Sequence, residues 1–217
     1  GVIGATIAHA LKVWPQAELR LYVGCYANDP ATLVAAMAAI GDDRRVRLVI
    51  HDKAGPTTKA DCLNRLYAAL CVDEQRGRQP FRGVVLHDAE DMVHPAALQA
   101  IDTALGTHDF IQLPVRPAEQ PASRWIAGHY GDEFAESHAK AMLVREALGA
   151  ALPSAGVGCA IERAALDQAW QVFEAIPADA SRNEHPSHDI WSRMHGRFHA
   201  ALHFLGDLHD PAHQIAA

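Results

Sequence analysis

Short apolar runs alternate with helix-like segments along almost the whole sequence, and no other feature constrains the fold as strongly. Strands that alternate with helices build a mainly parallel sheet with helices on both faces, because each helix returns the chain to start the next strand. In such sheets, ligands bind at the carboxyl ends of the strands. The predicted strands are 19–23, 46–50, 83–87, 110–115, 159–161 and 202–205, and the predicted helices are 2–13, 30–40, 58–72, 95–106, 122–149, 163–173 and 189–201.

The helix predicted after the first strand has the clearest boundaries. Asp29 suits the N-cap, and Pro30 suits the first helical position. Gly41 marks the end of this helix. Residues 76–82 are polar and predict a loop. No linker divides the α/β pattern, so residues 1–217 are expected to form a single domain.

Composition limits the kinds of partner. The 26 acidic residues outnumber the 19 basic ones, and the net charge of −7 argues against a nucleic-acid backbone as partner. A nucleotide remains compatible, because a metal ion can bridge acidic side chains to phosphates. The four cysteines form no C-x-x-C pair, which argues against a zinc ribbon or a redox motif. No apolar run approaches the ~20 residues of a membrane helix, so this segment is expected to be soluble.

The sharpest candidate site is an acidic turn that directly follows a predicted buried strand. The strand is 83–87, and the turn contains Asp88, Glu90 and Asp91. Carboxylate oxygens in a tight turn suit Mg²⁺ or Mn²⁺, which bind few protein carboxylates and keep positions for phosphate oxygens. An acidic helix N-terminus, favoured by the helix dipole, explains the same residues without a metal. The turn by itself leaves both interpretations open.

Several segments taken in order resemble the family 2 glycosyltransferases. The closest resemblance is to the NfrB-like membrane glycosyltransferases, a group named for a role in bacteriophage adsorption. Each motif is weak alone, but their joint order and spacing is specific, and the resemblance runs from about residue 2 to residue 205. The segments that carry it are Leu21–Thr32, Gly55–Asn64, Leu86–Leu98, Ser154–Leu166 and His188–Phe204.

The resemblance implies a GT-A, Rossmann-like fold and a metal-dependent, inverting transfer of a hexosyl group. The donor would be a nucleotide-diphosphate sugar, the cofactor Mn²⁺ or Mg²⁺, and the acceptor a hydroxyl of a glycan or lipid-linked sugar. It further implies a role in envelope polysaccharide synthesis, with a membrane-anchored parent protein acting at the cytoplasmic face of the bacterial inner membrane. A non-catalytic binding or scaffold module in polysaccharide export or phage adsorption is the alternative.

On the donor side, the resemblance implies that Asp88, Glu90 and Asp91 hold the metal, with Asp88 also contacting the donor. Lys59 would approach a phosphate, and Asn64 would hold its loop by hydrogen bonds. A solvated Lys59 and an Asn64 that caps a local turn fit the same sequence.

Four further residues complete the implied site. Asp29 would contact the ribose or the base, although its N-cap role is sufficient by itself. Gly156 and Gly158 would shape the acceptor pocket, or form an ordinary tight loop with positive φ. Asp189 would be the general base near the acceptor hydroxyl, or the N-cap of the following helix.

Three departures from the family pattern weaken the catalytic interpretation. The family's first strand, which holds the nucleobase, has no counterpart, so the chain is expected to be a fragment of a longer protein that lacks this strand. The usual Glu-Asp pair is His188-Asp189 here. No Gln-x-x-Arg-Trp motif follows it, since Ser123-Arg124-Trp125 lies in a different part of the chain.

Overall fold

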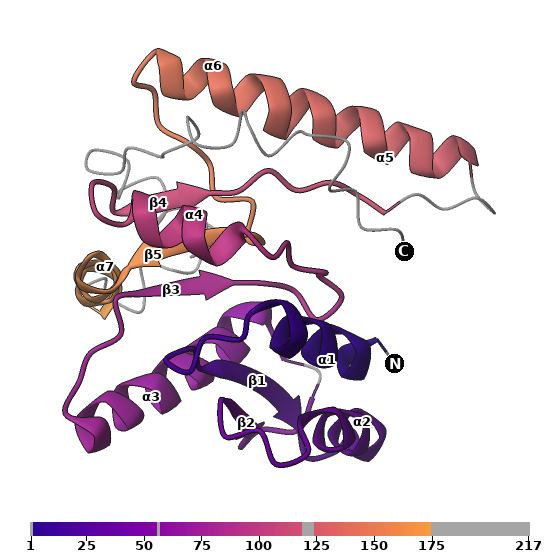
Figure 1. Ribbon diagram of the computed structural model, residues 1–217, viewed down its shortest axis with the longest axis vertical. Coiled ribbons are helices and arrows are strands. Elements are labelled where there is room, and N and C mark those ends of the chain that lie inside the picture. Colours follow the sequence, from indigo (N-terminus) through magenta and orange to yellow (C-terminus); the bar gives the residue numbers. More distant parts are fainter. Residues whose placement is uncertain (1, 56, 119–123, 175–217) are drawn as a thin grey trace. The chain divides into compact units, whose positions relative to one another are not determined.

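The structure is a computed structural model that describes residues 2–55, 57–118 and 124–174 (Figure 1). The chain groups into two compact units. Of the described residues, the first contains 2–55, 57–81 and 88–98, and the second contains 82–87, 99–118 and 124–174. No helix within the described ranges is long and apolar enough to cross a membrane.

The first unit is a two-stranded parallel sheet with three helices. Strand β1 pairs with β2 in register, with Leu21 opposite Val46 and Tyr26 opposite His51. The core of this unit contains Ile7, Val23, Cys25 and Ala36, and partly buried apolar side chains surround them. In chain order the elements are α1 (Ile3–Val13), β1 (Leu21–Tyr26), α2 (Pro30–Ile40), β2 (Val46–His51) and α3 (Lys59–Gly77).

The helix boundaries of this unit follow the local sequence signals. Asp29 caps α2 by accepting from the backbone N–H of Thr32, and Gly41 ends the helix with a φ of 52°. Thr58 opens α3 in a capping box with Asp61. The loop predicted at 76–82 is wrong at its start, because α3 continues to Gly77. Residues 73–76 are Asp-Glu-Gln-Arg, and three of these four are good helix formers despite their polarity.

The second unit contains a three-stranded sheet with the order β3-β5-β4. Strand β5 is antiparallel to both of its neighbours, and its first residue Cys159 lies opposite Gln112, the last residue of β4. Its elements are β3 (Gly83–Leu86), β4 (Phe110–Gln112), α5 (Arg124–Glu136), a π-helix (Ser137–Ala141), α6 (Met142–Ala147), β5 (Cys159–Glu162) and α7 (Arg163–Glu174), while α4 (Ala97–Ala104) spans the boundary between the units.

The expectation of a mainly parallel sheet is therefore correct for β1–β2 and wrong for the pairs made by β5. After the long helix, residues 148–158 carry the chain back along the sheet, so β5 starts beside the end of β4 (Figure 1). The long helix predicted at 122–149 is present but contains the π-turn. Within the described residues β1 pairs only with β2, and the missing upstream strand stays a prediction. The elements predicted at 189–201 and 202–205 lie outside the described residues.

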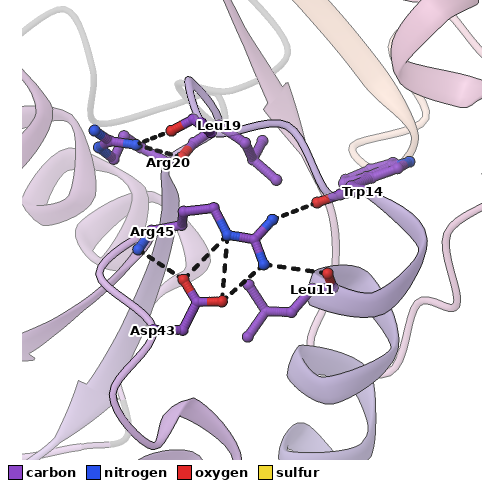
Figure 2. A network of polar contacts seen from close by, with 7 residues as sticks. Leu11, Trp14, Leu19, Arg20, Asp43 and Arg45 are labelled. Carbon is purple, nitrogen blue, oxygen red and sulfur yellow. Dashed lines mark hydrogen bonds and ion pairs between the residues drawn. The ribbon is translucent and has the colours of Figure 1, made fainter.

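A charged network closes the C-terminal end of α1 (Figure 2). The Arg45 guanidinium donates to the carbonyl oxygens of Trp14 at 2.6 Å and Leu11 at 3.2 Å. These carbonyls belong to the last turn of the helix, where intrahelical partners are lacking. Arg45 also binds both carboxylate oxygens of Asp43. Hydrogen bonds from Arg45 lower the pKa of Asp43 to about 2, and the bonds from its side chain contribute more than the bond from its backbone N–H.

We predict that Arg45→Met lowers the free energy of unfolding by about 1–3 kcal/mol, because it removes charge-assisted bonds and leaves two helix-end carbonyls without their donor. Urea titration at pH 7 measures this loss, with the exposed neighbour Arg44→Met as the matched control. The contribution of the pair is full above the ordinary Asp pKa of 3.8 and is lost as the pH falls towards 2. Equal stabilities of the two variants would contradict the role of Arg45.

Candidate functional site

Side chains of α1 hold the segment that contains the acidic turn. The hydroxyl of Thr6 donates to the carbonyl oxygen of Ala89 at 2.8 Å. The His9 ring donates to the Val93 carbonyl at 2.8 Å, and the Trp14 indole donates to the His94 carbonyl at 3.0 Å. All these residues belong to the first unit. The position of the acidic turn is therefore fixed by side-chain hydrogen bonds to backbone carbonyls within the turn and just after it.

Within the turn, Asp91 has a structural role. Its Oδ2 accepts from the backbone N–H of Asp88 at 2.7 Å, and its own N–H donates to the Asp88 carbonyl at 3.2 Å. The two bonds close the turn from both directions. Glu90 is exposed at the tip, whereas Asp88 and Asp91 are half-buried. Of the two candidates for the second metal ligand, Glu90 is the one whose carboxylate is not used to close the turn.

The structure brings Lys59 and Asp88 together. The Lys59 ammonium lies 2.5 Å from Oδ1 of Asp88, and the two side chains are 53% and 39% exposed. Lys59 is the first residue of α3, where the partial positive charge of the helix end disfavours a cation. Asp88 offsets this repulsion, and an anionic ligand would do the same. Because both groups are partly exposed, the pair stabilises the fold only weakly and can be exchanged for other partners.

The carboxylates of the turn fit a metal ion that is shared with a ligand. Among the described residues, no three His, Cys, Asp or Glu side chains are grouped so as to hold a metal ion. Asp88 and Glu90 nevertheless offer the hard oxygen donors that Mg²⁺ and Mn²⁺ prefer. These ions are commonly held by one or two carboxylates, with phosphate oxygens and waters completing the coordination. The turn therefore suits a metal that arrives with a phosphate ligand, not a closed protein cage.

The contacts of Asp29 and Asn64 do not involve the Lys59–Asp88 pair. The two carboxylate oxygens of Asp29 accept hydrogen bonds from the hydroxyl and the backbone N–H of Thr32. Both bonds lower the pKa of Asp29, and the bond from the hydroxyl has the larger effect. The N-cap role of Asp29 is thus observed. Asn64 is exposed on α3, five residues after Lys59, which places it about 140° around the helix from that side chain. No contact of the described residues joins it to the acidic turn.

The carboxyl ends of β1 and β2 carry a second group of polar side chains. The rings of Tyr26 and His51 stack with centroids 5.3 Å apart, and the Tyr26 hydroxyl lies 2.7 Å from the Thr57 hydroxyl. Asn28 exchanges two hydrogen bonds of 2.8 Å with the backbone of Gly55. A Cβ on Gly55 would lie 2.8 Å from the Tyr26 ring, so only glycine fits beside it.

The sequence analysis did not single out His51, the last residue of β2. It is 5% exposed, and its Nε2 has no hydrogen-bond partner among the described residues. Its place as the last residue of a strand was the available signal, because ligands gather at such strand ends.

In the second unit, the predicted acceptor loop has the backbone expected of its glycines. Gly156 has a φ of 75° and Gly158 a φ of 63°, values that other residues rarely adopt. The loop also contacts Gln112, which the sequence analysis missed because its partners lie far along the chain. Asp189 lies outside the described residues.

Comparison with known proteins agrees with the resemblance. The sequence model of "Glycosyltransferase like family 2" matches residues 1–186. The chain is 37% identical over 166 residues to bacteriophage adsorption protein B of Escherichia coli (strain K12) and to bacteriophage N4 adsorption protein B of Escherichia coli O157:H7. Each match covers 76% of this chain and 22% of the relative, so the chain spans about a fifth of the length of these relatives. No solved structure matches.

We predict that Asp91→Ala lowers the free energy of unfolding by about 1 kcal/mol, because the Asp88 N–H loses its acceptor. Glu90→Ala removes an exposed carboxylate from the same turn and should stay within about 0.5 kcal/mol of the wild type. Urea unfolding of both variants at pH 7 makes the comparison. If Glu90→Ala proves the more damaging of the two, the division of roles within the turn is wrong.

Proposed function

The chain belongs to the glycosyltransferase-like family 2, and on this basis we propose that it is the catalytic part of a metal-dependent, inverting glycosyltransferase. The donor is a nucleotide-diphosphate sugar, and the acceptor is a hydroxyl of a glycan or lipid-linked sugar. Asp88 and Glu90 hold Mn²⁺ or Mg²⁺, which offsets the negative charge of the diphosphate when bound. The contact between Lys59 and Asp88 is the observation that carries this proposal.

Charge exchange explains how this pair serves a donor. A diphosphate brings negative oxygens to a site where an ammonium and a helix N-terminus already provide positive charge. Lys59 can turn from Asp88 to a phosphate oxygen, which frees the carboxylate for the metal. Each group keeps a partner of opposite charge before and after the donor binds, so the exchange leaves no charge unpaired.

The acceptor side of the proposal involves the second unit and the region beyond it. Gly156 and Gly158 shape the acceptor pocket, and Asp189 removes the proton from the acceptor hydroxyl as it attacks the sugar. Asp29 contributes to the ribose or base subsite, and Asn64 contributes to the substrate site from α3. The parent protein would act in envelope polysaccharide synthesis, anchored at the cytoplasmic face of the inner membrane.

The names of the two relatives favour a second candidate. Both are called adsorption proteins, and His188-Asp189 departs from the family's Glu-Asp pair. A non-catalytic module of the same fold would bind a partner in phage adsorption or polysaccharide export without transferring sugar. Such a module need not keep metal-dependent nucleotide binding, so nucleotide binding followed by turnover separates the two candidates.

We predict that Asp88→Ala removes Mn²⁺-dependent nucleotide binding while the fold persists. Loss of an outer-shell partner costs about 10–100-fold in metal affinity, and loss of a direct ligand should cost at least as much. Calorimetry with UDP, GDP and ADP, with and without Mn²⁺, measures the effect. The control is Asp42→Ala, which removes an exposed carboxylate of the same unit just after α2. Unchanged binding in Asp88→Ala would remove the metal assignment.

We also predict that Asp189→Asn in the full-length protein retains donor binding but loses about 10²–10⁴-fold in transfer rate. The amide keeps the size of the carboxylate but cannot take the acceptor's proton at neutral pH. Transfer per folded molecule and nucleotide affinity are measured on the same preparation. A less stable protein with normal turnover would show that Asp189 only caps a helix.

A further inference from the structure

Gln112, the last residue of β4, is a buried amide whose bonds all go to backbone atoms. Its side chain is fully buried, at 0% exposure. The Nε2 group donates to the carbonyl oxygens of Leu113 and Val157, both at 2.9 Å. The Oε1 atom accepts from the N–H of Ala155 at 2.9 Å. Burying an amide is costly unless its donors and acceptor are satisfied, so the backbone around it must keep a matching shape.

The segment that Gln112 contacts is the loop Ser154–Gly158. At the end of the loop, the Gly158 N–H donates to the Leu86 carbonyl and the Gly158 carbonyl accepts from the Leu113 N–H, each at 2.8 Å. Within the loop, the Ser154 hydroxyl accepts from the N–H of Gly156 at 3.2 Å. The hydrogen bonds between Gln112 and the backbone of Ala155 and Val157 therefore link the middle of the loop to β4.

An apolar side chain at this position would fill the space but could not make the same hydrogen bonds. The two preceding residues of β4, Phe110 and Ile111, are buried and apolar, so the strand does not require a polar residue. Replacing Gln112 by an apolar residue would leave the Ala155 N–H and the Val157 carbonyl without this partner. Only a side chain that donates and accepts at one end satisfies both groups.

We infer that Gln112 is a positioning residue that fixes the Ser154–Gly158 loop in the conformation that receives the acceptor. Gln112 acts through Ala155 and Val157 and needs no contact with the sugar. The part of this inference that concerns the acceptor rests on the proposed function. The hold of Gln112 on the loop rests only on the observed contacts.

Gln112→Glu in the full-length protein tests this hold. At pH 9, where even a buried carboxyl group of raised pKa ionises, the carboxylate keeps an acceptor for Ala155 but faces the carbonyl oxygens of Leu113 and Val157 without a proton to donate. Amide hydrogen exchange across 154–158 should become at least about tenfold faster than in the wild type. Burial raises the pKa of a carboxyl group, so the acid form regains a donor as the pH falls. The excess exchange should therefore shrink at pH 5, measured against the wild type at each pH.

The matched control is Gln99→Glu, an equal change on the exposed face of α4, which should leave exchange in the loop unchanged at both pH values. Loop exchange in Gln112→Glu equal to that of the wild type at pH 9 would overturn the inference. A rise spread over the whole second unit and equally large at pH 5 would also overturn it, because that pattern reports general destabilisation.

Turnover tests the link to the acceptor. Membranes from producing cells supply the acceptor, and UDP-glucose, UDP-N-acetylglucosamine and GDP-mannose serve as labelled donors. In Gln112→Glu at pH 9, UDP affinity in Mn²⁺ should stay within about twofold of the wild type while transfer falls about tenfold. A parallel loss of UDP affinity would overturn the acceptor-side role. If the wild type transfers label from none of the donors, the proposed function fails, and the exchange data still decide whether Gln112 holds the loop.

Discussion

Hydrogen bonds from α1 and its C-cap residue Trp14 to the carbonyl groups of Ala89, Val93 and His94 are the contacts on which the position of the acidic turn depends. They fix a segment that contains no helix or strand up to residue 96 and would otherwise have few ties to the sheet. Arg45 extends this dependence, because it anchors the end of α1 that carries Trp14. The acidic turn is thus held by a hydroxyl, an imidazole and an indole together with a helix-end cap, and its carboxylates at Asp88 and Glu90 need not support the fold.

The two half-buried carboxylates of the turn have different partners: Asp91 closes the turn, and Asp88 forms an ion pair with Lys59. Asp91 satisfies a backbone N–H, a bond that an incoming ligand cannot replace without opening the turn. Asp88 meets the Lys59 ammonium, a partner that a metal ion can replace. An exposed pair of this kind contributes little to stability, and its replacement costs little. A site that must accept and release a charged ligand benefits from such weakly held charges.

The sequence predicted features that depend on neighbouring residues and missed those that depend on distant ones. Asp29, Pro30 and Gly41 predicted the limits of α2 correctly because caps and helix ends are local. The antiparallel direction of β5 was not predictable, since it depends on where residues 148–158 carry the chain. Gln112 and Arg45 were missed for the same reason: their partners are backbone atoms 45 and 31 residues away, which no local pattern identifies.

The way in which the Ser154–Gly158 loop is held decides which of its positions can vary. Gln112 binds Ala155 and Val157 through their backbone groups, so the side chains at these two positions can change while both hydrogen bonds remain. Gly156 and Gly158 cannot change in the same way, because their positive φ excludes most other residues. The loop therefore alternates fixed and variable positions on a backbone of constant shape.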